Sequence, residues 1–210
     1  MNVVDYVKLW FYGIVKPAEA IKTIQKKKPD LKEGVISVAL LGLIMGAINA
    51  IITTLVGTRD LVGTWLNGII INPIMIIVEL LVFAAIYHAI AALLKGKSSF
   101  GQRAGFFGIF MGISVVAMLP MLALIVIASL LPTSLAIAMV VLMVIGVIGT
   151  MMAAGIAVGT LFSVLPGIEK TKLPRTGLIL GTTAGVIFIL MMIIVVLFAQ
   201  YIVGTSPMLA

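Results

Sequence analysis

Polar and apolar positions divide the chain into a charged N-terminal stretch and five long apolar segments separated by short polar ones. An apolar stretch of about 18 residues or more with few charges is a membrane-span candidate, since about 20 residues of helix cross the hydrocarbon core. The pattern therefore predicts an all-α, polytopic membrane protein. We expect five transmembrane helices, at about Gly34–Val56, Trp65–Leu94, Ala104–Leu131, Leu135–Leu165 and Gly177–Val203.

The third and fourth segments belong to a stretch of 65 uncharged residues between Arg103 and Glu169. As one helix this stretch would be about 98 Å long. The chain must therefore turn, and "LLPTS" at 130–134 supplies a proline and two small polar residues for a hairpin. Pro120 is expected to kink the third helix rather than end it, because backbone groups that face lipid must stay paired. The fourth segment is long enough that it must tilt, break near its glycines or protrude.

The basic residues gather on one side of this arrangement. Seven lysines precede the first span, three basic residues lie between spans two and three, and three lie between spans four and five, whereas only Arg59 lies between spans one and two. Lysine and arginine accumulate in cytoplasmic loops. The pattern predicts a cytoplasmic N-terminus and an external C-terminus, with two crossings rather than three between the basic loops.

Composition agrees with lipid as the main solvent. Hydrophobic residues make up 62% of the 210, the mean hydropathy is +1.31, and 10% of residues are charged, against about 25% in soluble domains. The absence of cysteine excludes disulfides and thiolate chemistry. Because the positive charge follows the topology, we expect no nucleic acid as a partner. For a multi-pass protein of the cell membrane, the expected partners are membrane lipids and another integral membrane protein or a second copy of the chain.

Residues 1–33 are expected to form a cytoplasmic segment before a bundle at 34–204 and a short external tail at 205–210. Pro17 can open a short helix with Ala20, Ile21 and Ile24 as its apolar stripe. Its lysines either attract an anionic leaflet or only fix the orientation, and aromatic residues among them are typical of an interfacial anchor. Residues expected at the cytoplasmic interface are Trp10, Pro17, Lys26, Lys27, Lys28, Lys97, Phe100 and Arg103.

Glu79 is the only charged side chain deep in a span, near the midplane when counted from Trp65. Such residues usually face the bundle interior and mark functional sites. Asn72 falls on the same helical face, and His88, the only histidine, lies about two turns closer to the cytoplasm; the three form a candidate intramembrane polar site. Either Glu79 binds a proton or cation as a carboxylate, or it is protonated and hydrogen-bonded to Asn72 or another helix.

The remaining chemistry argues against an enzyme. Intramembrane proteolysis needs paired acids or a serine–histidine pair, and Glu79 is the only acid within the spans. A lone histidine without a second ligand is no metal site. We therefore expect no catalytic residue, no bound metal and no cofactor.

Glycines recur at four-residue steps, which lets helix backbones approach closely in lipid. Packing within the five-helix bundle explains most of them, and a homodimer seam along the fifth span is the alternative. The candidate helix-packing positions are Gly42, Gly46, Gly108, Gly112, Gly155, Gly159, Gly177, Gly181 and Gly185.

Gly96-Lys97-Ser98 matches the last three letters of a phosphate-binding loop. That pattern needs a glycine five residues before the Gly-Lys pair and a preceding strand. Ala91 stands at that position, after a long apolar run. A nucleotide site is therefore not expected.

The chain resembles the Yip domain, a family of five-pass membrane proteins named for interaction with Ypt/Rab GTPases. The similar features are "LWFYGIVKPAEAIKTI" before a glycine-rich first span with "GLIMGAI", and the basic loop "KGKSSFGQRAGFFG" opening a third span with "SVVAMLP". The resemblance implies a non-enzymatic integral membrane protein with a cytoplasmic N-terminus, and Gly96-Lys97-Ser98 as part of its inner loop. Relatives that bind GTPases carry a longer cytosolic N-terminal region, which argues against GTPase binding here.

Two functions remain open from the sequence. The first is a membrane-organising or adaptor protein that binds a partner or lipid through its helix bundle. The alternative is a small-solute or ion transporter with a midplane site around Glu79.

Overall fold

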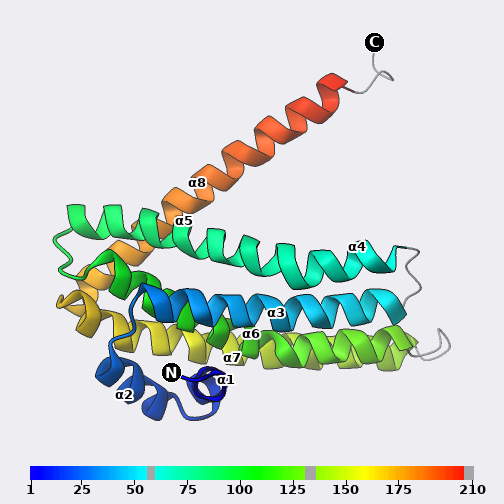
Figure 1. Cartoon of the computed structure of the whole chain (residues 1–210), viewed down its shortest axis with the longest axis horizontal. Helices are drawn as coiled ribbons and strands as arrows, with labels where there is room; N and C mark the ends of the chain where they lie inside the picture. Colours follow the sequence, from blue (N-terminus) through cyan, green and yellow to red (C-terminus); the bar gives the residue numbers. More distant parts are fainter. Residues whose placement is uncertain (56–59, 131–135, 206–210) are drawn as a thin grey trace.

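The computed structural model describes residues 1–55, 60–130 and 136–205, which are helical apart from short connections. Five helical segments within this part are long and apolar enough to cross a membrane, which confirms the all-α, polytopic prediction. Four of them lie side by side and the last leans away (Figure 1). The elements are α1 (Val3–Val15), α2 (Pro17–Lys27), α3 (Leu31–Leu55), α4 (Leu61–Leu66), η1 (Asn67–Ile71), α5 (Asn72–Leu93), α6 (Phe100–Leu130), α7 (Ala136–Glu169) and α8 (Leu173–Thr205).

The N-terminal segment and both basic loops meet at one end of the bundle, which we call the basic end. There α3 begins, α5 gives way to α6, and α7 gives way to α8 (Figure 1). The predicted pairing of the loops through two crossings is therefore consistent with the helix order. Arg59, residues 131–134 of the predicted turn and 206–210 of the predicted tail lie outside the described residues.

The second span is interrupted by a π-helical turn, η1, directly before α5. Pro73 follows it, and because proline has no N–H and crowds the preceding turn, a wider turn accommodates it. The same region receives α3 at backbone distance: a Cβ on Gly46 would lie 1.8 Å from the carbonyl oxygen of Gly68, and one on Gly42 would lie 2.5 Å from Cα of Pro73. These two glycines pack within the bundle as predicted.

Helix α6 is the central helix of the bundle. Its apolar stretch is 56% buried, against 33% or less in the other four spans. It contacts α3 through Gly108, where an added Cβ would lie 2.4 Å from the carbonyl oxygen of Gly34. The Ser37 hydroxyl donates to the Gly108 carbonyl at 2.9 Å. Small residues and one interhelical hydrogen bond thus hold α3 against α6, as expected where water exclusion gives little driving force.

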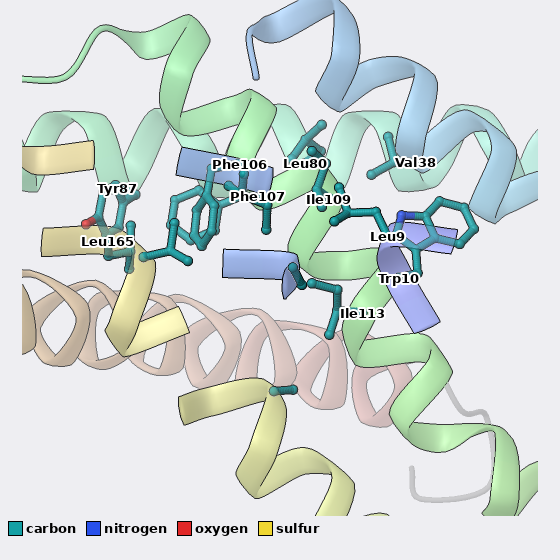
Figure 2. Packing of buried hydrophobic residues seen from close by; sticks show 14 of the residues in the cluster. Leu9, Trp10, Val38, Leu80, Tyr87, Phe106, Phe107, Ile109, Ile113 and Leu165 are labelled. Carbon is teal, nitrogen blue, oxygen red and sulfur yellow. The ribbon is translucent and has the colours of Figure 1, made fainter. Parts of the chain in front are cut away.

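An aromatic cluster fills the centre between α5 and α6 (Figure 2). The ring of Phe107 meets Phe83 and Tyr87 edge-on, with centroids 4.7 Å and 4.8 Å apart. Edge-to-face pairs are favourable beyond their buried area, by about 1 kcal/mol each. This cluster fixes the mutual rotation of the two helices.

Helix α1 crosses the bundle and buries Trp10, which corrects the prediction that Trp10 lies at the membrane interface. Trp10 is 2% exposed, and its indole N–H donates to the Ser37 hydroxyl at 3.1 Å. It fills a slot over Gly112, where a Cβ would lie 2.2 Å from the indole nitrogen. Trp10 is therefore a packing residue of the bundle rather than an interfacial anchor, because Gly112 and Ser37 leave a ring-sized space that the linear sequence does not reveal.

Both N-terminal helices have recognisable boundaries. Asn2 and Asp5 form a capping box at the start of α1, which satisfies two orphan N–H groups. Tyr6 is fully buried on this helix, and burial, followed by the nearby carboxylates Glu33, Asp30 and Asp5, raises its pKa to about 12.

Helix α2 begins at Pro17, as predicted, and buries two positions of its expected stripe, Ala20 and Ile24. It ends at Lys27, and the capping residue Lys28 has a φ of 46°, in the left-handed region. The buried face packs against α7. The predicted short helix is confirmed, and its lysines lie on the exposed side.

The long α7 runs unbroken through Pro166 to Glu169. Its 34 residues span about 51 Å, whereas about 30 Å crosses the hydrocarbon core. Of the alternatives of tilting, breaking and protruding, breaking is wrong for the described part of this helix. Tilting and protruding both accommodate the surplus length.

Candidate functional site

The three residues of the predicted polar site do not come together. Asn72 donates to the Gly42 carbonyl of α3 at 3.4 Å. His88 belongs to a charged cluster at the basic end. Glu79 stays on the exposed face of α5, where it lines a groove. The shared-site prediction is wrong because helical spacing aligns residues on one helix, while neighbouring helices decide which of them has a partner.

The groove around Glu79 has a volume of about 710 Å³ and lies where α8 leaves the bundle. Its walls come mainly from α5, α6 and α8, with one residue each from α3 and α7, and almost all of the side chains are aliphatic or aromatic. Val82 on α5 and Leu190 on α8 line it and remain 53% and 44% exposed, so the groove is open from outside the bundle. The polar side chains in its lining are Glu79 and Ser114.

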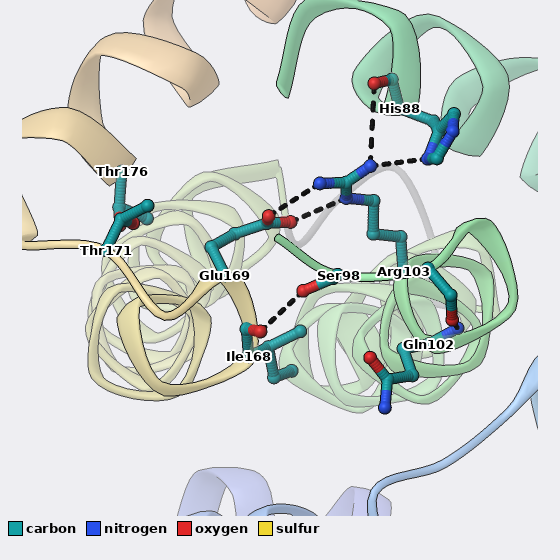
Figure 3. Close-up of polar contacts among 9 residues, drawn as sticks. His88, Ser98, Gln102, Arg103, Ile168, Glu169, Thr171 and Thr176 are labelled. Carbon is teal, nitrogen blue, oxygen red and sulfur yellow. Dashed lines mark hydrogen bonds and ion pairs between the residues drawn. The ribbon is translucent and has the colours of Figure 1, made fainter. Parts of the chain in front are cut away.

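The charged cluster at the basic end is the feature that the sequence predictions missed. Arg103, from the first turn of α6, and Glu169, at the last residue of α7, are 1% and 0% exposed. Arg103 Nε and Nη2 donate to the two carboxylate oxygens of Glu169, each at 2.7 Å (Figure 3). This bidentate geometry is the strongest that a guanidinium–carboxylate pair adopts. Arg103 was expected as an interface residue that sets topology, and it is instead buried between helices.

Side chains of α5 complete the surroundings of the pair. Arg103 Nη1 is hydrogen-bonded to Nδ1 of His88, and it approaches the His88 carbonyl at 3.5 Å (Figure 3). The Tyr87 ring lies 5.9 Å from the guanidinium carbon, within cation–π range. One arginine therefore ties the basic ends of α5, α6 and α7 together.

Gly96 is required beside the ion pair. A Cβ at this position would lie 2.5 Å from Glu169 Oε2 and 3.0 Å from Arg103 Nη2. Any side chain there would displace the carboxylate or the guanidinium. The glycine of the Gly-Lys-Ser loop thus serves packing against a buried ion pair, not a phosphate.

The other polar groups of this loop are bonded to the end of α7. The Lys97 amide donates to the Glu169 carbonyl at 3.2 Å, and the Ser98 hydroxyl donates to the Ile168 carbonyl. The last carbonyls of a helix have no partner within it, so these bonds satisfy them. The structure thereby supports the expectation that Gly96-Lys97-Ser98 is not a nucleotide loop.

The remaining interface predictions divide by exposure. The side chains of Lys26, Lys27 and Lys97 are exposed, as an interfacial position requires. Phe100 is partly buried and meets the His88 ring edge-on, with centroids 5.8 Å apart. It therefore also supports the charged cluster.

The helix-packing glycines fall into two groups. Gly42, Gly46, Gly108 and Gly112 make the close approaches described above. The five others lie on α7 and α8 without close neighbours; an added Cβ would meet nothing within 4 Å at four of them, and Phe162 at 3.9 Å at the fifth. Packing among the described residues does not account for that group, which consists of Gly155, Gly159, Gly177, Gly181 and Gly185.

One sequence signal could have identified the ion pair. Arg103 and Glu169 bracket the uncharged stretch at its two ends, with opposite signs. When that stretch folds into an antiparallel helical hairpin, its ends meet at the same side of the membrane. The cluster offers no free acid–base pair, because its carboxylate and guanidinium bind each other.

The chain matches no protein-family model, no curated protein and no solved structure.

Proposed function

We propose that this protein is a non-enzymatic membrane-organising protein of the Yip-domain type in the cell membrane, and that its groove between α5, α6, α7 and α8 holds a transmembrane helix of a partner. The observation that carries the proposal is the groove itself, about 710 Å³ of apolar space beside an exposed carboxyl.

A helix suits this groove better than a soluble ligand does. Apolar walls within a bilayer attract through packing, not through exclusion of water, so a ridge of side chains is the appropriate occupant. Glu79 adds a polar anchor, because a carboxyl facing hydrocarbon is costly unless a donor meets it. The partner helix should therefore carry a hydrogen-bond donor near the depth of Glu79.

The buried ion pair supports a scaffold role. Arg103 and Glu169 hold α6 to α7, and His88 adds α5. These groups stabilise one arrangement of the walls, which pre-forms the groove and lowers the ordering cost of binding.

Site-specific photocross-linking tests the proposal. A photoreactive phenylalanine analogue placed at Val82, within the groove, should give one stoichiometric adduct with a membrane polypeptide in native membranes. The matched control is Met152, 68% exposed on α7 and outside the groove, which should give lipid adducts alone. The Val82 adduct should also weaken when Glu79→Gln is introduced. Lipid adducts alone at Val82, or a partner captured equally at both positions, would contradict the proposal.

Transport is the second candidate, favoured by the carboxyl of Glu79 and the hydroxyl of Ser114 in one groove. Reconstitution into proteoliposomes distinguishes the two functions. Substrate or proton flux that disappears with Glu79→Gln would replace the adaptor proposal by a transporter. No flux, together with the Val82 cross-link, supports the adaptor.

A further inference from the structure

A second cavity of about 390 Å³ lies at the basic end, away from the apolar groove. It is bounded by the end of α2, the first turn of α6 and the end of α7. Four of its lining side chains are polar: Gln25, Lys28, Gln102 and Lys170. In Figure 3 the Gln102 amide points away from the ion pair and toward the N-terminal segment drawn in blue. Polar donors from α2, from α6 and from the residues that follow α2 and α7 therefore line one space.

The charge of this cavity is positive. Its lining contains two lysines and no acidic side chain. Glu169, adjacent to Lys170 in sequence, is already bound by Arg103 on both carboxylate oxygens. Its charge is therefore compensated by Arg103, and neither Lys28 nor Lys170 forms an ion pair among the described residues, so both charges stay available for an anion.

Both lysines stand in backbone conformations that favour glycine. Lys28 and Lys170 follow the ends of α2 and α7 with φ of 46° and 51°. Glycine adopts this conformation without steric penalty, whereas other residues lose about 1 kcal/mol. Lys95 ends α5 in the same way, with φ of 61°, yet does not line the cavity. Lys95 therefore serves as a comparison: a lysine needed only for its place after a helix should behave like Lys95, whereas a lysine that serves the cavity should not.

The cavity lies at the basic end, among the charged residues that flank the spans, and this position suits a lipid headgroup. The basic end begins where the uncharged stretch of the bundle stops, and α7 is about 20 Å longer than the hydrocarbon core requires. Ile24, Pro29 and Ile168 give the same cavity an apolar wall. A ligand with an anionic head and an apolar body matches both parts.

We propose that this cavity binds the phosphate group of an anionic phospholipid, with Lys28 and Lys170 as charged donors and Gln25 and Gln102 as neutral ones. The phosphate chemistry is shared with free inorganic phosphate, and the apolar wall favours the lipid. The site is independent of the groove at Glu79, so either can fail without the other.

Native mass spectrometry of the purified full chain tests the charge requirement. The probes are micelles doped with dioleoylphosphatidylglycerol or with zwitterionic dioleoylphosphatidylcholine. We expect one tightly retained phosphatidylglycerol and no retained phosphatidylcholine. Lys28→Gln with Lys170→Gln should weaken retention at least about tenfold, since each lysine near an anionic lipid contributes about fivefold. The charge-matched control, Lys95→Gln with Lys172→Gln, should change it less than about twofold; equal losses in both pairs would overturn the discrete site.

A size variant tests the cavity without changing charge. Gly167 lines the cavity, and a Cβ there has room, with Gln25 Nε2 as its nearest neighbour at 3.7 Å. Gly167→Leu should fill the space and abolish retention while favouring the helix, because leucine is a better helix former than glycine. Gly159→Leu, on the same helix outside the cavity, should retain the lipid. Lipid retained by Gly167→Leu would overturn the proposal.

Inorganic phosphate separates the two sources of the anion. Lipid-free protein should show no thermal stabilisation by millimolar phosphate. Stabilisation that depends on Lys28 and Lys170 would make the free ion the ligand and overturn the lipid assignment.

Discussion

Replacing one partner of the Arg103–Glu169 pair should destabilise the protein far more than an ordinary polar substitution. Both side chains are almost fully buried, and two 2.7 Å hydrogen bonds join them. Removing one partner of such a pair leaves an uncompensated buried charge, which costs about 3–5 kcal/mol. An exposed pair such as Lys16–Glu19 contributes at most about 1 kcal/mol.

The expected loss in the free energy of unfolding follows from the surroundings of the guanidinium. In Glu169→Met, Arg103 keeps its hydrogen bond to His88 and the Tyr87 ring as a cation–π neighbour. These contacts recover part of the loss, so we expect about 3 kcal/mol. Arg103→Met leaves the Glu169 carboxylate buried without a cationic donor and should reach the upper part of the range. The double variant Arg103→Met with Glu169→Met removes both charges and should lose less than either single variant.

A double-mutant cycle measures this in reversible unfolding by denaturing detergent in mixed micelles. The free energy of unfolding should show a coupling of at least about 2 kcal/mol between the two positions. Lys16→Met is the control for losing a surface ion pair and should change the free energy by less than about 1 kcal/mol. Additive effects of the two buried substitutions, or single-variant losses as small as that of Lys16→Met, would refute the description of the cluster as a coupled structural lock.

Three further predictions concern packing and pH. Gly46→Ala should lower the free energy of unfolding by at least about 2 kcal/mol, because its Cβ would meet the Gly68 carbonyl oxygen at 1.8 Å. Gly155→Ala, with open space around it, should raise helix stability slightly. Thermal unfolding of the two variants compares these effects. Trp10→Ala should lose about 3 kcal/mol and detach α1 from the bundle, which limited proteolysis of the N-terminal segment detects; resistance equal to wild type would contradict the packing role. The stability of the folded protein should fall as pH rises from 10 to 12, because the unfolded Tyr6 ionises near 10 while the folded pKa is about 12; Tyr6→Phe should remove this part of the slope in unfolding measured across that range.

The lengths of the apolar segments could be determined from sequence because the bilayer fixes them. A helix must pair its own backbone groups in lipid, and the hydrocarbon core sets the number of residues. The predicted spans agree with the helices to within a few residues at most ends, although η1 interrupts the second span and α7 ends later than expected. The short α2 was equally predictable, since Pro17 and the apolar stripe act within one helix.

Interactions between helices were not determined in this way. Trp10 has the composition of an interfacial anchor, but Ser37 and Gly112, distant in sequence, make a slot for it. Arg103 has the sign and position of a topology signal, but Glu169 and His88 surround it. In each case the residue type and its local position suggest a role, but the partner that decides the role is distant in sequence.

The sequence by itself determined that the helices are suited to lipid, how many spans there are, and at which end the positive charge collects. These features depend on local hydropathy and on charge counted along the chain. Only the tertiary structure decided which polar groups are buried together, which glycines carry close packing, and where the groove and the cavity at the basic end lie. Those features arise from the rotation and depth of each helix against its neighbours. In lipid, many faces of an apolar helix are nearly equivalent, so a few small residues and hydrogen bonds between helices select the final arrangement.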